Sequence, residues 1–165
     1  MMNFSSNRKG NIILESLLVL IVLMVFALIA INGANILSDL TTEITGDTDV
    51  AQEAKDEITD LESRYPANLD GAFALAFGLL WLVTLITSFM VDSKPAFFVV
   101  SLVLFIGVLI AGGLLSNAYD EWSGDSEIST FADEFPMSNF ILQNLIMVLL
   151  VLGGSIAIVM FAKTR

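Results

Sequence analysis

The chain has 165 residues, of which 56% are hydrophobic, and a formal net charge of −11 at pH 7. A soluble domain of this length rarely has so apolar a composition, and the excess of carboxylates disfavours nucleic acid as a partner because phosphate binding needs clustered Lys and Arg. The lack of cysteine and histidine excludes disulfides, thiolate metal sites and catalysis by thiol or imidazole groups.

Four apolar segments are long enough to cross a bilayer, at residues 12–31, 72–91, 96–115 and 140–161. A spanning helix needs about 20 apolar residues, and backbone groups in lipid must pair within their own segment, so each should be α-helical. The predicted fold class is therefore an all-α integral membrane protein, with four transmembrane helices in a single membrane domain over residues 1–165. The first segment begins like a signal peptide, but its apolar run is too long and no A-x-A site follows, so we expect it to be retained.

Basic residues predict the orientation of these helices. Five of the seven lie before the first span, between the second and third spans, or after the fourth, which places them all on one side of the membrane. Under the positive-inside rule that side is cytoplasmic, so both termini are expected inside. The five residues are Arg8, Lys9, Lys94, Lys163 and Arg165.

Glu15 is the only ionisable residue within a predicted span. A carboxylate near a helix N-terminus is stabilised by the helix dipole, and Lys9 or Arg8 could reach it, which gives a local structural interpretation. A proton relay or transport role is the alternative, because ionisable groups inside membranes are often functional. A relay needs further polar partners, and the other spans offer mainly hydroxyl groups such as that of Thr84.

A third interpretation of Glu15 comes from its sequence context. The stretch from Arg8 to Glu15, RKGNIILE, resembles the cleavage region of type IV prepilins. The resemblance implies cleavage after Gly10, a new N-terminus at Asn11 and a role for Glu15 as the assembly carboxylate. It covers the first helix alone, and it departs from the pilin pattern in having Asn11 at a usually apolar position and three further spans in place of a soluble head domain.

The first outer loop, residues 32–70, has ten carboxylates and a helical pattern of apolar residues. The pattern predicts that the first span continues beyond the membrane to a turn at residues 45–49. Asp49 and Gln52 have the spacing of a capping box for a second helix, Pro66 is expected to end that helix, and Asp70 to cap the second span. The prediction is an extramembrane helical hairpin in loop one.

The carboxylates of this loop allow two interpretations, a solvated face or a docking surface for a basic partner or for cations. The spacing of Asp47, Asp49 and Glu53 is loosely calcium-like, but the glycine and ligand series of an EF-hand loop is absent, so no metal site is predicted. The residues of loop one expected to face a partner are Asp47, Asp49, Glu53, Asp56 and Glu57.

The second outer loop, residues 116–139, has six carboxylates and no basic residue. Asp120, Glu121 and Asp125 are further candidates for contact with a partner. Aromatic residues are interleaved with them and suggest an interfacial belt, with Phe131 and Phe135 on a short amphipathic helix lying on the headgroups. A partner-binding aromatic patch is the less favoured alternative. The aromatic residues are Tyr119, Trp122, Phe131 and Phe135.

Small residues four positions apart predict where helices approach closely. The pairs are Ala30 with Ala34, Ala74 with Gly78, Gly107 with Ala111, and Gly153 with Ala157.

Residues 89–120 and 135–163 are similar to small multi-pass proteins of tailless icosahedral viruses with an internal membrane. The similarity lies in segments such as DSKPAFF at residues 92–98, SNAY at 116–119 and FPMSNF at 135–140. It implies a structural role, in which the protein populates the internal membrane and links it to the capsid.

The sequence therefore predicts a non-enzymatic structural protein of a membrane assembly, with a virion internal membrane as the leading location and a prokaryotic plasma membrane as the alternative. The expected partners are the lipid bilayer and membrane or capsid proteins, with basic partners suggested by the acidic loops, in a homo- or hetero-oligomer. No catalytic residue, cofactor or nucleic acid is expected. A small transporter or channel component and a pilin-like assembly subunit remain alternatives, and acid–base catalysis by Asp133 and Glu134 has little support because no nucleophile or pocket signal lies nearby.

Overall fold

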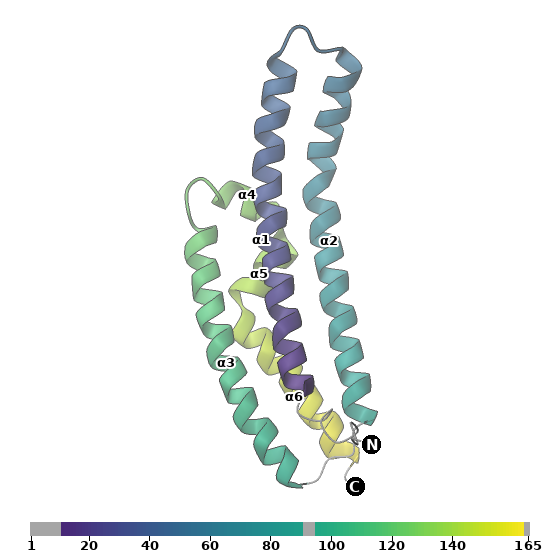
Figure 1. The fold of residues 1–165 in the computed structure, drawn as a ribbon, viewed down its shortest axis with the longest axis vertical. Helices are drawn as coiled ribbons and strands as arrows, with labels where there is room; N and C mark the ends of the chain where they lie inside the picture. Colours follow the sequence, from purple (N-terminus) through teal and green to yellow (C-terminus); the bar gives the residue numbers. More distant parts are fainter. Residues whose placement is uncertain (1–10, 91–94, 164–165) are drawn as a thin grey trace, which may run out of the picture.

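The computed structural model describes residues 11–90 and 95–163, and the side chains of residues 21–89 and 102–159 among them. This part of the chain is helical and contains no strand, which confirms the all-α prediction (Figure 1). The helices are α1 (Asn11–Gly46), α2 (Gln52–Met90), α3 (Pro95–Ser123), α4 (Ser129–Asp133), α5 (Pro136–Gln143) and α6 (Leu145–Lys163).

Three of the described helices are long and apolar enough to cross a membrane, over Ile21–Gly46, Gln52–Phe89 and Leu102–Ser123. The helix pair α5 and α6 makes a fourth if it is counted as one broken span. Large apolar side chains on these helices point outward, as at Leu75, which is 70% exposed, and Ile110, which is 63% exposed. Such outward-facing apolar surface is typical of helices that are solvated by lipid.

The helices α1 and α2 form one long antiparallel hairpin. They have 36 and 39 residues, which corresponds to roughly 54 and 58 Å at 1.5 Å per residue. The two helices run side by side for their whole length, whereas α3 to α6 pack only beside the lower part (Figure 1). We call residues 32–70 the acidic hairpin; its upper part stands clear of the other helices, so the predicted helical hairpin is present.

Two predicted details of the acidic hairpin are wrong. Helix α2 begins at Gln52 rather than being capped by Asp49, and Gln52 Nε2 donates a hydrogen bond to Asp56 Oδ1 at 2.9 Å instead of completing a capping box. Pro66 lies inside α2 and does not end it. Proline costs a helix interior about 3 kcal/mol; packing against α1 on both sides of Pro66, through Tyr65 and Phe73, offsets that cost.

The core lies where the lower hairpin meets the other helices. Four small or β-branched residues of α1, at positions 27, 30, 31 and 34, are at most 5% exposed and form its centre. They pack with residues from α2, α3 and the segment around α5, because short side chains let helices approach closely. The members from outside α1 are Phe73, Tyr119, Ala132, Phe135 and Leu142.

The predicted small-residue contacts are partly confirmed. Ala30 and Ala34 are buried, and a side chain at Gly153 would overlap the Phe105 ring of α3. Gly107, however, faces open space, and the glycine of α3 that packs closely on α6 is Gly112, against Leu149. The close approach between α3 and α6 is therefore real, but it involves Gly112, the residue after Ala111 of the predicted pair.

The predicted fourth span, residues 140–161, is not one straight helix. It is broken at Asn144, and α5 and α6 are bent by 79° relative to each other. The Asn144 side chain donates to the Phe140 carbonyl oxygen at 2.9 Å, and Ser116 of α3 donates to the Gln143 carbonyl oxygen at 2.5 Å. The Phe140 carbonyl oxygen also keeps its helical bond from the Asn144 amide at 3.1 Å, and the Ser116 hydroxyl gives the Gln143 carbonyl oxygen a partner at the bend.

Candidate functional site

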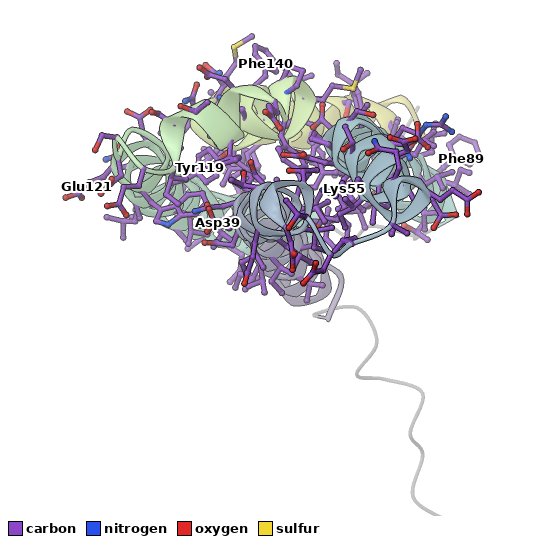
Figure 2. All side chains as sticks on the ribbon, turned by 90° about the horizontal axis from the view of Figure 1, so that it is seen from above. Asp39, Lys55, Phe89, Tyr119, Glu121 and Phe140 are labelled. Carbon is purple, nitrogen blue, oxygen red and sulfur yellow. The ribbon has the colours of Figure 1, made fainter. Side chains whose placement is uncertain are left out.

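All eight acidic residues expected to face a partner are exposed, and they form two groups. Five surround the turn at the tip of the acidic hairpin, and the other three lie at the end of α3 and in the turn that follows it. Glu121 points to the outer rim of the molecule, whereas Tyr119 on the same helix points inward (Figure 2). The first group consists of Asp47, Asp49, Glu53, Asp56 and Glu57, and the second of Asp120, Glu121 and Asp125.

The hairpin tip is ordered by hydrogen bonds that leave most of its carboxylates unneutralised. Asp47 Oδ1 accepts a bond from the Asp49 amide at 2.9 Å, which stabilises the turn. Lys55 Nζ donates to the Thr45 carbonyl oxygen at 3.0 Å, so this cation ties α2 to the end of α1. The described residues contain one ion pair, between Arg64 and Asp60 at 2.8 Å on successive turns of α2. The negative potential of the tip is therefore largely uncompensated.

The two acidic segments approach each other at Glu62 and Glu134. Glu134 follows α4, and Glu62 lies on α2. Partial burial and the nearby negative charge of Glu62 both raise the pKa of Glu134 above its ordinary value. At this point the acidic hairpin and loop two are therefore close enough for the charge of Glu62 to act on Glu134. Within the described residues, no group of three or more Asp and Glu side chains has a geometry that could hold a metal ion.

The residues of the predicted N-terminal motif are only partly described. Asn11 is the first residue of α1, and Glu15 lies in its second turn. Gly10 and the side chain of Glu15 lie outside the described residues. The interpretations of Glu15 as a helix-cap, relay or assembly carboxylate all remain predictions.

Asp70 has a structural role that differs from the predicted one. It lies inside α2 and does not cap that helix. Its side chain is 4% exposed and reaches across to α5, where it accepts bonds from the amides of Met137 at 2.9 Å and Ser138 at 2.7 Å. The Ser138 hydroxyl donates to the same carboxylate at 2.7 Å. A buried carboxylate at a helix N-terminus is stabilised by these donors and by the helix dipole, so Asp70 joins α2 to α5.

Tyr119 lies beside this cap. Its side chain is 1% exposed and within electrostatic range of Asp70. The Tyr119 hydroxyl and Asn139 Oδ1 are the buried side-chain polar atoms, among the described residues, that have no hydrogen-bond partner. The Asp70 carboxylate therefore accepts three hydrogen bonds, whereas the nearby Tyr119 hydroxyl has none. An unpartnered buried polar atom destabilises a fold.

The aromatic residues of loop two do not form the predicted interfacial belt. Phe135 is fully buried and Tyr119 almost so, and the Tyr119 and Trp122 rings pack with their centroids 5.9 Å apart. Phe131 is partly buried against the core, on the five-residue helix α4, which packs on α1. The acidic stretch of loop two folds back over the bundle, and its aromatic side chains close the core there.

Sequence reasoning missed the cap formed by Asp70 and the break at Asn144. One available signal was Pro136, because proline favours the first position of a helix and therefore marks the start of α5. The second signal was Asn144, a polar residue within an apolar run. Neither signal identifies Asp70 as the partner, since 67 residues separate it from Met137.

No protein-family model, curated protein or solved structure matches this chain.

Proposed function

We propose that the protein is a non-enzymatic structural component of a membrane assembly, in which the acidic hairpin contacts a basic partner protein outside the bilayer. In its most specific form, the assembly is a virion with an internal membrane and the partner belongs to the capsid. The protein then anchors in the membrane through its apolar helices and links that membrane to the shell.

One observation carries this proposal. The helices α1 and α2 continue without interruption from apolar segments into the acidic hairpin, whose five tip carboxylates are exposed. About 20 residues suffice to cross the hydrocarbon core. Each of these helices is far longer, so a span of ordinary length leaves the tip more than about 20 Å beyond the hydrocarbon core at 1.5 Å per residue. A loop that is only solvated needs no helical extension of this length. An element that presents its carboxylates to a partner at a distance from the membrane does need one.

The construction of the hairpin supports a mechanical role. Gly33 of α1 packs against the Tyr65 ring of α2, Thr41 is 6% exposed, and Lys55 bonds to the end of α1. These contacts are distributed along the hairpin and make it stiff. A stiff, charged element positions a partner at a fixed height and attracts it by long-range electrostatics.

The test is co-purification from the native assembly with matched charge variants. A tip variant replaces Asp47, Asp49, Glu53, Asp56 and Glu57 with the corresponding amides. A second variant does the same at Asp120, Glu121 and Asp125 and tests those other partner candidates separately. We expect the unaltered protein to cross-link to a basic partner, and this cross-link to weaken as the salt concentration rises. The tip variant should lose the cross-link. Recovery of the unaltered protein as a lone monomer, without capsid or other subunits, would contradict the proposal.

The alternatives make different predictions. A transporter or channel needs polar groups along a path through the bundle, yet the hydroxyls of Thr84 and Ser88 donate to carbonyl groups of their own helix. A flux assay in liposomes, with Glu15→Gln as the variant, tests that function.

A pilin-like subunit predicts removal of residues 1–10, which an intact-mass measurement detects.

A further inference from the structure

An apolar groove lies between α2, α5 and α6, and no polar residue lines it. Its volume is about 250 Å³. The α2 and α6 residues that line it belong to segments apolar enough to lie within a membrane. The lining includes Phe77, Trp81, Phe140, Met147, Val151 and Leu152.

The one hydrogen-bonding side chain at the groove is already used. Trp81 Nε1 donates to Ser155 Oγ on α6 at 3.1 Å, and Ser155 Oγ donates to the Leu152 carbonyl oxygen at 2.6 Å. The indole ring is therefore held in place between α2 and α6 and offers the groove only its apolar surface. A polar ligand would find no bonding partner there and would lose its hydration, so the occupant must be hydrocarbon.

The size of the groove decides which apolar molecules can lie within it. An apolar cavity of about 150 Å³ already accommodates a benzene-sized molecule, so the larger groove accepts a longer chain. A helix of a second protein copy has a diameter of about 10–12 Å with its side chains, so it could cover the groove but could not lie within it. An extended chain of methylene groups does fit. The groove lies at the bend, where α5 and α6 are inclined by 79° to each other and both pack on α2.

We propose that the groove is a binding site for one acyl chain of a membrane lipid. Phe140, Met147 and Val151 are each more than half exposed and form the outer wall, while Phe77 and Trp81 form the floor. Phe140 lies at the outer edge of the bundle (Figure 2). This site depends on the protein residing in a bilayer and is independent of whether the acidic hairpin binds a capsid.

The experiment uses Trp81 as the reporter. Trp122→Phe leaves Trp81 as the single tryptophan of the full-length chain, and the protein is reconstituted in phosphatidylcholine vesicles with increasing fractions of lipid brominated in its acyl chains. We expect Trp81 quenching to saturate at a lower fraction than random contact with the bulk lipid produces. Native mass spectrometry of the detergent-purified protein should show one retained phospholipid per chain.

Two variants narrow the groove, Val151→Phe and Met147→Phe, and Leu150→Phe is the control because Leu150 is 50% exposed on the same helix without lining the groove. Overpacking of this kind should lower lipid occupancy about fivefold or more in both narrowing variants and leave the control unchanged. Circular dichroism checks that each variant is folded. If one narrowing variant fails to fold, the other is sufficient for the test. Equal lipid retention in all folded variants, no retained lipid in the unaltered protein, or a dimer that protects Trp81 would each overturn the proposal.

Discussion

At the scale of single residues, the most consequential side chain is one that interacts across the fold. Asp70 is a buried carboxylate whose three described donors all come from the start of α5. Charge-assisted bonds of this kind are stronger than those between neutral groups. Removal of the acceptor leaves the buried Ser138 amide and the partly buried Met137 amide without this partner, which costs more than the loss of the bonds themselves.

We therefore expect Asp70→Ala to lower the free energy of unfolding by about 2–4 kcal/mol, because buried donors lose a charged acceptor. Ser138→Ala is the matched control, since it removes one hydroxyl donor and keeps both amide bonds; its cost should be near 1 kcal/mol. Denaturant titration in detergent, followed by circular dichroism, measures both values. A loss below about 0.5 kcal/mol for Asp70→Ala would show that the cap is unimportant.

Tyr119→Phe has the opposite expected effect. The hydroxyl is buried without a hydrogen-bond partner, and removing an unsatisfied polar group should stabilise the fold by about 1 kcal/mol. The same unfolding titration measures it. A clear destabilisation would mean that the Tyr119 hydroxyl has a bonding partner in the folded protein.

Glu134 gives a pH-dependent prediction. Burial and the charge of Glu62 raise its pKa in the folded state, so its ionisation opposes folding, and the fold loses stability as the pH rises through that pKa. Glu134→Gln should therefore match the parent protein in acid and be the more stable of the two at neutral pH. Unfolding curves at a series of pH values measure the difference, and Glu62→Gln should reduce it. An effect of Glu134→Gln that is the same at every pH would refute the assignment.

At the scale of elements, the acidic hairpin depends on close contact between α1 and α2. A Cβ atom at Gly33 would overlap the Tyr65 hydroxyl and would lie 3.1 Å from Tyr65 Cζ. Alanine has a higher helix propensity than glycine, so any destabilisation by Gly33→Ala must come from this contact rather than from the helix itself.

We expect Gly33→Ala and Tyr65→Phe to be coupled by about 1 kcal/mol or more, because phenylalanine removes the overlapping hydroxyl and makes room for the methyl group. The double-mutant cycle is measured by unfolding. Gly78→Ala is the control, since a Cβ atom there meets nothing within 4 Å. Additive effects of the two changes would mean that α1 and α2 are not in contact at Gly33 and Tyr65.

At the scale of the whole molecule, like charge accumulates on one part of the fold. The chain has eighteen acidic and seven basic residues, and the described part contains a single ion pair. The carboxylates of the acidic hairpin and loop two therefore repel one another, and this repulsion opposes the compact state. Dissolved salt screens such repulsion between exposed charges that lie more than about 10 Å apart at 0.1 M.

Raising the NaCl concentration should therefore stabilise the protein. If screening contributes about 1 kcal/mol, Tm rises by about 2–4 °C for a chain of this size. The variant with five tip carboxylates replaced by amides should show a smaller rise. Thermal melts over a salt series check this, and a Tm that falls with added salt would contradict the repulsion argument.

The local pattern of the sequence was sufficient to predict the helical class, the apolar segments, the hairpin and the exposed position of the eight acidic residues expected to face a partner. These features follow from local properties, because burying a charge in lipid is costly and apolar runs must pair their own backbone groups. Tertiary structure alone decided that Pro66 lies within a helix, that Asp70 caps α5, and that Tyr119 and Phe135 are buried. Each of these depends on contacts between segments far apart in the chain, and their packing free energy outweighs the local preference of the residue.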